Sequence, residues 1–244
     1  MAIKIELVLS SKSNKKGFAI IAIIVGAAGA GIGAYTITSV STNSLQQPST
    51  LPTTDTGNQQ VLHSLILNGS PPLGSSDAPI TIVEFGDYQC PNCDRFALQI
   101  KPSIVENYIN TGKVKLVFKD FTIYGNDSVN GATATYCAAE QNKYWEMHDH
   151  LYENQKAINS GWLSVDNIKK FASEVGLQMQ QFNSCFDERK YNQRVMENFE
   201  QGKAAGVNGT PTFIIIGNNG QTKVVVGAQP FSVFKQVLDE MLVS

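Results

Sequence analysis

Apolar positions along the chain predict a strand–helix–strand unit, then a long helical block, then two strands and a helix. The run "ITIVEF" at 80–85 is β-branched and almost continuously apolar, as in a buried strand. A helix is predicted from Pro91, and we expect Pro102 to kink or break it. The run "KVKLVFKDF" at 113–121 alternates like a second strand. Strand, helix and strand within about 40 residues form a βαβ unit with parallel strands and a right-handed crossover.

The second half of the chain changes from strands to helices and back again. Residues 125–206 contain several amphipathic stretches with the spacing of helices, and no strand is predicted among them. Strands return at "TPTFIII" (210–216) and "TKVVVG" (222–227), joined by the turn "GNNG", and a closing helix begins at about Pro230. The predicted order is βαβ, helical block, ββα, which is an α/β fold with an inserted all-helical subdomain.

The N-terminal part of the chain has the pattern of a membrane segment. Residues 18–40 carry no charge, and as a helix they would measure about 34 Å, enough for a hydrocarbon core of about 30 Å. Three lysines lie just before this run, so we expect residues 1–17 in the cytoplasm and everything after Val40 outside. A cleaved signal peptide is the alternative, with a cleavage site near Ala30. Because the apolar run continues past that site, we favour a retained transmembrane helix; either way the body is exported.

A polar segment separates the apolar run from the predicted folded body. Residues 41–62 are rich in Ser, Thr, Gln and Pro and contain few large apolar side chains, which is typical of a flexible linker. A short strand is predicted at 63–69. The body then consists of a predicted α/β domain in two segments, 63–124 and 207–244, on either side of the helical subdomain 125–206.

Composition narrows the class of partner. The chain has 244 residues, 42% of them hydrophobic and 16% charged, which fits one globular domain with an insertion. Its formal net charge is −2, and the four lysines before residue 41 outnumber the single acid there. The remaining body is therefore more acidic than the whole chain. A basic surface that could follow a phosphate backbone is not expected, and neither is nucleic-acid binding.

Two of the four cysteines, Cys90 and Cys93, form the sequence "CPNC" between the predicted strand and helix. They could be a redox dithiol, half of a metal site or an incidental pair. Structural zinc would need two more ligands at usable spacing. The other cysteines, Cys137 and Cys185, do not form a second C-x-x-C, and the histidines of "HDH" face different directions on a helix. Free thiols oxidise outside the cell, which disfavours an incidental pair. We therefore expect a redox dithiol, with no metal and no other cofactor.

The position of the pair suits redox chemistry. A cysteine at the start of a helix meets unpaired backbone N–H groups and the positive end of the helix dipole, which favour its thiolate. Pro91 fits the first helical turn, where its missing N–H would have no partner. We expect Cys90 to be the nucleophile and Cys93, one turn later, to attack the mixed disulfide and release the product. A C-x-x-C within a βαβ unit is the thioredoxin-like signature.

Three segments carry a resemblance to a known family: "APITIVEFGDYQCPNC", "YCAAEQNKYWEMHDHLY" and "GVNGTPTFIIIG". Over about residues 63–242 the chain resembles the DsbA-like branch of the thioredoxin superfamily. This resemblance implies a thioredoxin fold with the helical block inserted between its halves. It also implies that Thr210 and Pro211 form a cis-proline loop facing the dithiol, where backbone groups of Thr210 would pair with an extended substrate. The best-known oxidising members carry His where this chain has Asn92, a neutral dipole, so we expect weaker thiolate stabilisation here.

Three further residues are candidates for roles beside the dithiol or away from it. Glu84 lies in the predicted strand six positions before Cys90, and burying its anion would be costly. It is either an exposed strand-end residue or a carboxyl beneath the helix that exchanges a proton with Cys93; relatives carry an acid at the matching position. Cys137 and Cys185 lie on separate predicted helices. Buried free cysteines are common, but in an exported protein we expect a structural disulfide between them.

These patterns predict a membrane-anchored, extracytoplasmic thiol:disulfide oxidoreductase. We expect it to oxidise, or exchange, disulfides in exported cysteine-containing polypeptides and to be recycled by a redox partner in the membrane. Reductase and isomerase activities remain alternatives. A non-catalytic thioredoxin-like module that binds extended segments of a partner is another, although the presence of both cysteines favours an enzyme. No dimerisation domain precedes the predicted fold, so we expect a monomer.

Overall fold

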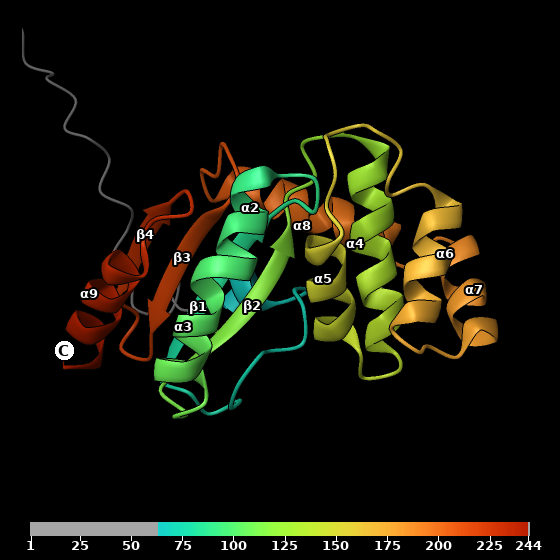
Figure 1. The fold of residues 1–244 in the computed structure, drawn as a ribbon. Coiled ribbons are helices and arrows are strands. Elements are labelled where there is room, and N and C mark those ends of the chain that lie inside the picture. Colours follow the sequence, from blue (N-terminus) through green and yellow to red (C-terminus); the bar gives the residue numbers. More distant parts are fainter. Residues whose placement is uncertain (1–62, 244) are drawn as a thin grey trace, which may run out of the picture. The chain divides into compact units, whose positions relative to one another are not determined.

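A computed structural model describes residues 63–243, which contain a four-stranded mixed sheet in the order β2-β1-β3-β4 (Figure 1). Strands β1 and β2 are parallel, β3 is antiparallel to β1, and β4 is antiparallel to β3. This confirms the predicted βαβ and ββα halves of a thioredoxin-like α/β fold. The strands are β1 (Ile80–Gly86), β2 (Val114–Asp120), β3 (Thr212–Gly217) and β4 (Thr222–Val226).

The predicted cytoplasmic segment, transmembrane helix and linker, residues 1–62, lie outside the described residues. Between residues 63 and 243, no helix has the length and apolar character needed to cross a membrane.

One long helical segment connects β1 to β2, and it continues through Pro102, where we expected a kink or a break. Instead, the turn before the proline widens, so that the N–H of Lys101 bonds to the carbonyl of Phe96, five residues back. Proline has no N–H to donate and its ring crowds the carbonyl one turn earlier, so the wider turn lets the helix pass it. The segment comprises α2 (Pro91–Arg95), the π-helical turn η1 (Phe96–Ile100), α3 (Lys101–Ile104) and a second π-helical turn η2 (Val105–Ile109).

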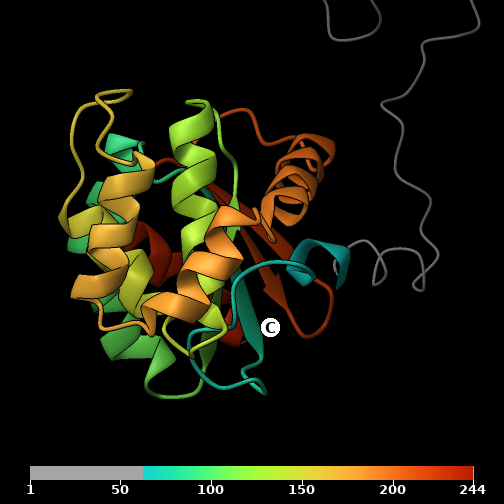
Figure 2. The same ribbon diagram turned by 90° about the vertical axis from the view of Figure 1, so that its right-hand side faces the viewer.

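The stretch between β2 and β3 is helical, as its spacing predicted. Helices α4 to α7 gather on the β2 side of the sheet, which is visible in both views (Figures 1 and 2). Helix α9 follows the last strand and closes the described fold. The helices are α4 (Asn126–Ala139), α5 (Tyr144–Glu153), α6 (Val165–Glu174), α7 (Met179–Asp187), α8 (Asn192–Ala204) and α9 (Phe231–Leu242).

Helices cover both faces of the sheet and shield its central strands from solvent. Phe96 from η1 and Phe234 from α9 pack against Phe213 of β3 on one face. On the opposite face, Phe199 of α8 stacks on Phe121, which follows β2. Strand β1 is buried at every position. Any polar side chain on β1 therefore lies in an apolar environment, and this strand leads directly to the dithiol.

The strand predicted at 63–69 is wrong. Residues 63–66 form a helical turn, in which the N–H of Leu67 bonds to the carbonyl of His63. The turn ends at Asn68, whose φ is positive at 61°. The chain meets the edge of β2 only afterwards, where Ser70 and Leu73 each bond to its backbone. A strand needs a continuous partner, and this segment has one only at those two points.

Candidate active site

The dithiol lies where β1 passes into the long helix. Cys90 is the N-cap residue of α2 and Pro91 occupies its first turn, as the sequence predicted. The side chain of Asn92 is on the exposed surface beside them. Both cysteines are free thiols, and they are buried, Cys90 at 2% exposed and Cys93 at 0%. The active-site sulfurs therefore sit just under the surface, at the positively polarised end of a helix.

The loop before β3 brings a second segment to the dithiol. The thiol of Cys90 donates a hydrogen bond to the carbonyl oxygen of Thr210, 120 residues further along the chain, at 3.3 Å. The peptide bond between Thr210 and Pro211 is cis. The fold thus brings together the residues that the resemblance had placed on opposite sides of an active site.

The two thiols have opposite acid–base character. The pKa of Cys90 is lowered to about 6, mainly by a hydrogen bond with the Cys93 side chain, with further help from the side chain of Thr210 and from the backbone of Cys93 and Asn92. Burial acts against this shift. The pKa of Cys93 is raised well above its usual value, first by burial and then by Cys90 and the charge of Glu84. Cys90 is therefore a thiolate near neutral pH, whereas Cys93 retains its proton.

Glu84 is buried in β1 and is not an exposed strand-end residue. It is 1% exposed, and neither of its carboxyl oxygens has a hydrogen-bond partner among the described residues. Burial raises its pKa to about 8; Lys101 opposes the rise, and the charges of Cys90 and Asp149 add to it. An acid with this pKa is protonated at neutral pH but can still lose its proton, and its charge acts on the thiol of Cys93.

An aspartate that the sequence patterns did not single out holds the loops around the dithiol. The carboxylate of Asp87 accepts hydrogen bonds from the N–H of Gln89 at 2.8 Å and the hydroxyl of Ser128 at 2.7 Å. It also accepts from the N–H groups of Ile123 at 2.8 Å and Tyr124 at 3.2 Å. One side chain thus fixes the loop before Cys90 to the loop after β2. Its position directly after a buried strand was the only signal in the sequence.

A glutamine from the inserted subdomain supports the same turn. The amide of Gln155 donates to the carbonyl oxygen of Tyr88 at 2.7 Å and to that of Cys90 at 3.2 Å. Nothing in the local sequence pointed to Gln155, because its contacts join segments about 65 residues apart. The helical block therefore takes part in shaping the dithiol turn.

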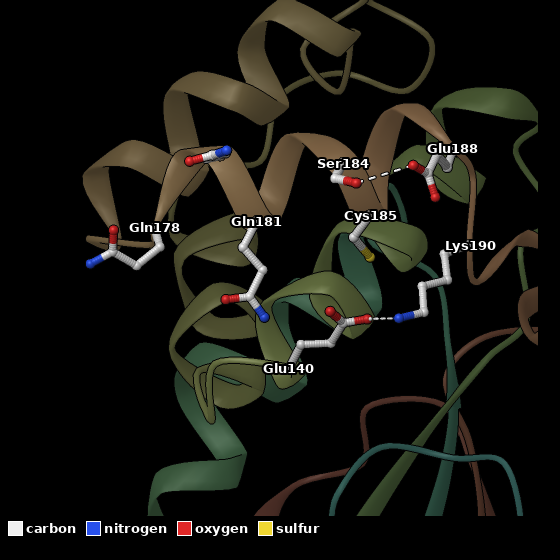
Figure 3. Close-up of a pocket in the computed structure, with 8 residues that line it drawn as sticks. Glu140, Gln178, Gln181, Ser184, Cys185, Glu188 and Lys190 are labelled. Atoms are coloured by element: carbon white, nitrogen blue, oxygen red, sulfur yellow. Dashed lines mark hydrogen bonds and ion pairs between the residues drawn. The ribbon is translucent and has the colours of Figure 1, made fainter.

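The second pair of cysteines lies elsewhere, between α4 and α7. Cys137 and Cys185 form a disulfide with a Cα–Cα distance of 5.8 Å. Beside it opens a polar cavity of about 590 Å³ (Figure 3), which does not include the dithiol. No group of three or more His, Cys, Asp or Glu side chains between residues 63 and 243 is arranged to hold a metal ion. The cavity is lined by Glu140, Gln178, Gln180, Gln181, Ser184, Cys185, Glu188 and Lys190.

Comparison with known proteins agrees with this geometry. Residues 67–239, most of the chain, match the family model described as thioredoxin. The chain belongs to the thioredoxin family. It is 31% identical over 168 residues to the probable disulfide bond formation protein D of Bacillus cereus, covering 67% of this chain and 76% of that protein. It is 27% identical over 192 residues to the disulfide bond formation protein D of Bacillus subtilis, covering 78% of this chain and 84% of that protein.

Solved structures place this thioredoxin-family chain beside DsbA-like proteins. The oxidised BdbD of Bacillus subtilis matches with a TM-score of 0.66 and 26% identity, covering 73% of this chain and 95% of BdbD. The α-DsbA1 of Wolbachia pipientis has the same fold, with a TM-score of 0.65 and 23% identity over 72% and 92% of the two chains. Together with the dithiol geometry, these relatives identify the chain as a DsbA-like thiol:disulfide oxidoreductase.

Proposed function

We propose that this protein forms disulfides in exported cysteine-containing polypeptides, and that Cys90 and Cys93 hold the disulfide it transfers. The observation that carries this proposal is the contrast between the two thiols. A stable Cys90 thiolate favours the reduced protein, so the oxidised pair gives up its disulfide readily. The printed names of the Bacillus relatives, disulfide bond formation proteins, support the same direction.

The reaction would proceed by two exchanges. A substrate thiolate attacks the sulfur of Cys90; the bond between Cys90 and Cys93 breaks, and Cys93 leaves as a thiolate. Because the pKa of Cys93 is so high, this thiolate takes a proton at once, and we assign Glu84 as the acid that supplies it. A second substrate thiolate then attacks the substrate sulfur of the mixed disulfide, and Cys90 leaves as a stable thiolate. The substrate gains one disulfide and the protein is left as the dithiol.

Substrate would bind as an extended segment along the loop at Thr210 and Pro211. The carbonyl of Thr210 is already within 3.3 Å of the Cys90 sulfur, so a chain that pairs with this backbone would have its own cysteine close to the attacked atom. Strand-like pairing uses main-chain groups and tolerates many side chains, which suits an enzyme for diverse polypeptides.

The rest of the proposal concerns the setting of the enzyme. We place it outside the cytoplasm, held by a single membrane helix at 18–40 and a linker at 41–62, and we expect it to act as a monomer. The lysines before the apolar run support this orientation. A redox protein in the same membrane would reoxidise the dithiol after each transfer, since otherwise the protein would turn over only once.

The test is the equilibrium reduction potential of the dithiol in the full chain, measured against glutathione. In thioredoxin the nucleophilic cysteine has a pKa near 7 and the reduction potential is about −270 mV. In DsbA the corresponding pKa is near 3.5 and the reduction potential is about −120 mV. Interpolation to the pKa of about 6 for Cys90 predicts about −230 mV. Oxidised protein should also form disulfides in reduced, unfolded ribonuclease A, and Cys90→Ser should abolish this. A potential at or below that of thioredoxin, with no disulfide formation, would indicate a reductase instead.

A further inference from the structure

A buried lysine acts on the carboxyl of Glu84, and the exchange reaction as written above does not use it. Lys101 is the first residue of α3 and is only 5% exposed. Its ammonium donates a hydrogen bond to Asp149 of α5, and the same carboxylate oxygen lies 2.7 Å from Nδ1 of His148. The ammonium is also 5.6 Å from the centre of the Trp145 ring. Burying an ammonium is costly even when it is paired, so this arrangement needs a reason.

The fold turns Lys101 inward by an unusual local structure. The π-helical turn η1 ends at this residue, through the bond from the N–H of Lys101 to the carbonyl of Phe96. Ile100, Lys101 and Ile104 are consequently all buried. Turns of this type are frequent at functional sites, because they redirect one side chain without ending the helix.

The charge of Lys101 acts on Glu84 and lowers its pKa against the effect of burial. The residues that pair with Glu84 across the sheet, Phe118 of β2 and Phe213 of β3, are apolar and offer it no cation. Within the part of the chain that the structure describes, its carboxyl oxygens have no hydrogen-bond partner. Among the described residues that act on its pKa, Lys101 favours the anion, whereas Cys90 and Asp149 disfavour it. The titratable groups coupled to Glu84 are Cys90 and Cys93 of the dithiol turn, Lys101 of α3, and Asp149 and Tyr152 of α5. His148, also of α5, contacts Asp149.

We propose that Lys101 is a positioning residue for the exchange at Cys93: held by Asp149, its ammonium keeps the anion of Glu84 accessible near neutral pH. This rests on the proposed role of Glu84. When Cys93 leaves as a thiolate, the proton of the Glu84 carboxyl moves to the Cys93 sulfur, and the new carboxylate is stabilised by Lys101. When Cys93 attacks a mixed disulfide, the proton moves back. Without Lys101 the carboxylate would lose the opposite charge that acts on it among the described residues. Accepting the proton of Cys93 would then need a higher pH, and Glu84 would be a weaker acid toward the Cys93 thiolate.

The two steps can be followed separately with a chromogenic aromatic disulfide added to the reduced full-length protein. Attack by Cys90 releases one coloured thiolate, and resolution by Cys93 then releases a second. In Lys101→Met, whose side chain has a similar length and no charge, the pH midpoint of the second release should rise by about one unit or more. At pH 7 this is a slowing of about tenfold, while the first release should change less than about twofold. Lys101→Arg keeps the charge and should restore the midpoint.

Lys119→Met is the matched control. Lys119 is also a buried lysine, at 0% exposed, but its ammonium bonds to the carbonyl of Leu67 and to Gln201. This variant should leave the midpoint of the second release unchanged. If it shifts the midpoint as far as Lys101→Met does, or if Lys101→Met slows both releases equally at every pH, Lys101 is a packing residue only. Should Lys101→Met fail to fold, as judged by circular dichroism, Lys101→Gln takes its place with the same expected outcomes.

Glu84→Gln separates this inference from the function it rests on. If Lys101 acts through Glu84, adding Lys101→Met to Glu84→Gln should cause no further slowing of the second release. If Glu84→Gln alone leaves the second release unchanged, the proposed role of Glu84 fails and the inference fails with it. If Glu84→Gln slows the second release but Lys101→Met does not, the role of Glu84 stands and that of Lys101 is wrong.

Discussion

Replacing Glu84 by glutamine should make the reduced protein more stable at neutral pH. Glu84 is 1% exposed, and neither carboxyl oxygen has a hydrogen-bond partner within residues 63–243. Its anion therefore loses water without gaining a bond there. Glutamine has nearly the same shape as glutamate and no charge. The substitution therefore removes the free-energy cost of burying an ionisable carboxyl, and it opens no cavity. Lys101 bonds to Asp149, and we expect this bond to persist in the variant.

The size of the effect follows from the pKa of Glu84, which rises from 4.5 to about 8 on folding. Because the folded state has the higher pKa, it binds more protons than the unfolded state between these values. The wild-type protein therefore loses stability as the pH rises from about 4.5 to about 8. Each pH unit in this window costs about 1.4 kcal/mol. Glu84→Gln should thus be more stable than wild type by about 3 kcal/mol at pH 7, but by less than about 1 kcal/mol at pH 5.

Denaturant unfolding of the reduced full chain at both pH values, followed by tryptophan fluorescence, measures this difference. Mass spectrometry should first verify that mild reduction has opened only the dithiol. The control is Glu106→Gln, which neutralises an exposed acid on the same long helical segment and should change the free energy of unfolding by less than about 0.5 kcal/mol. The reasoning is refuted if Glu84→Gln is no more stable than wild type at pH 7, or if its gain is the same at both pH values.

Three other predictions test the thiols and the topology. Alkylation of the reduced protein should label Cys90 with a midpoint near pH 6 and spare Cys93; preferential labelling of Cys93 would reverse their roles. The Cys137–Cys185 bridge closes a separation of 48 residues, so changing both to alanine should cost about 4 kcal/mol in the free energy of unfolding. Mass spectrometry that finds these two thiols free in protein from its native compartment would argue against a structural bridge. Protease added to intact cells or protoplasts should release an active domain from the proposed anchor at 18–40, and a domain that stays protected until lysis contradicts that topology.

Secondary-structure predictions that depended only on local periodicity agreed with the structure. Those that depended on contact with another segment of the chain agreed less often. The β1 and β2 strands and the helical block follow from alternation or helical spacing within the segment itself. The strand predicted at 63–69 is a helical turn instead, because an apolar run forms a strand only where a neighbouring edge is free along its length. At Pro102, where we expected a kink or a break, the helical segment continues through a wider turn. Ile100 and Ile104 pack with residues of the sheet, and η1 contacts α5, so tertiary packing supports the segment on both sides of the proline.

The sequence by itself determined that the protein carries a pair of redox-capable thiols and that this pair lies at the N-terminus of a helix. Cys90 and Cys93 are two positions of one helical turn, and a strand followed at once by a helix places them at a helix N-terminus whatever the rest of the chain does. Only the tertiary structure decided how that chemistry is tuned. The carbonyl of Thr210 arrives from 120 residues away, and the burial of Glu84, the charge of Lys101 and the support of Gln155 come from separate elements. A pKa depends on solvation and on distances to other charges, and both are set by long-range packing that no local pattern encodes.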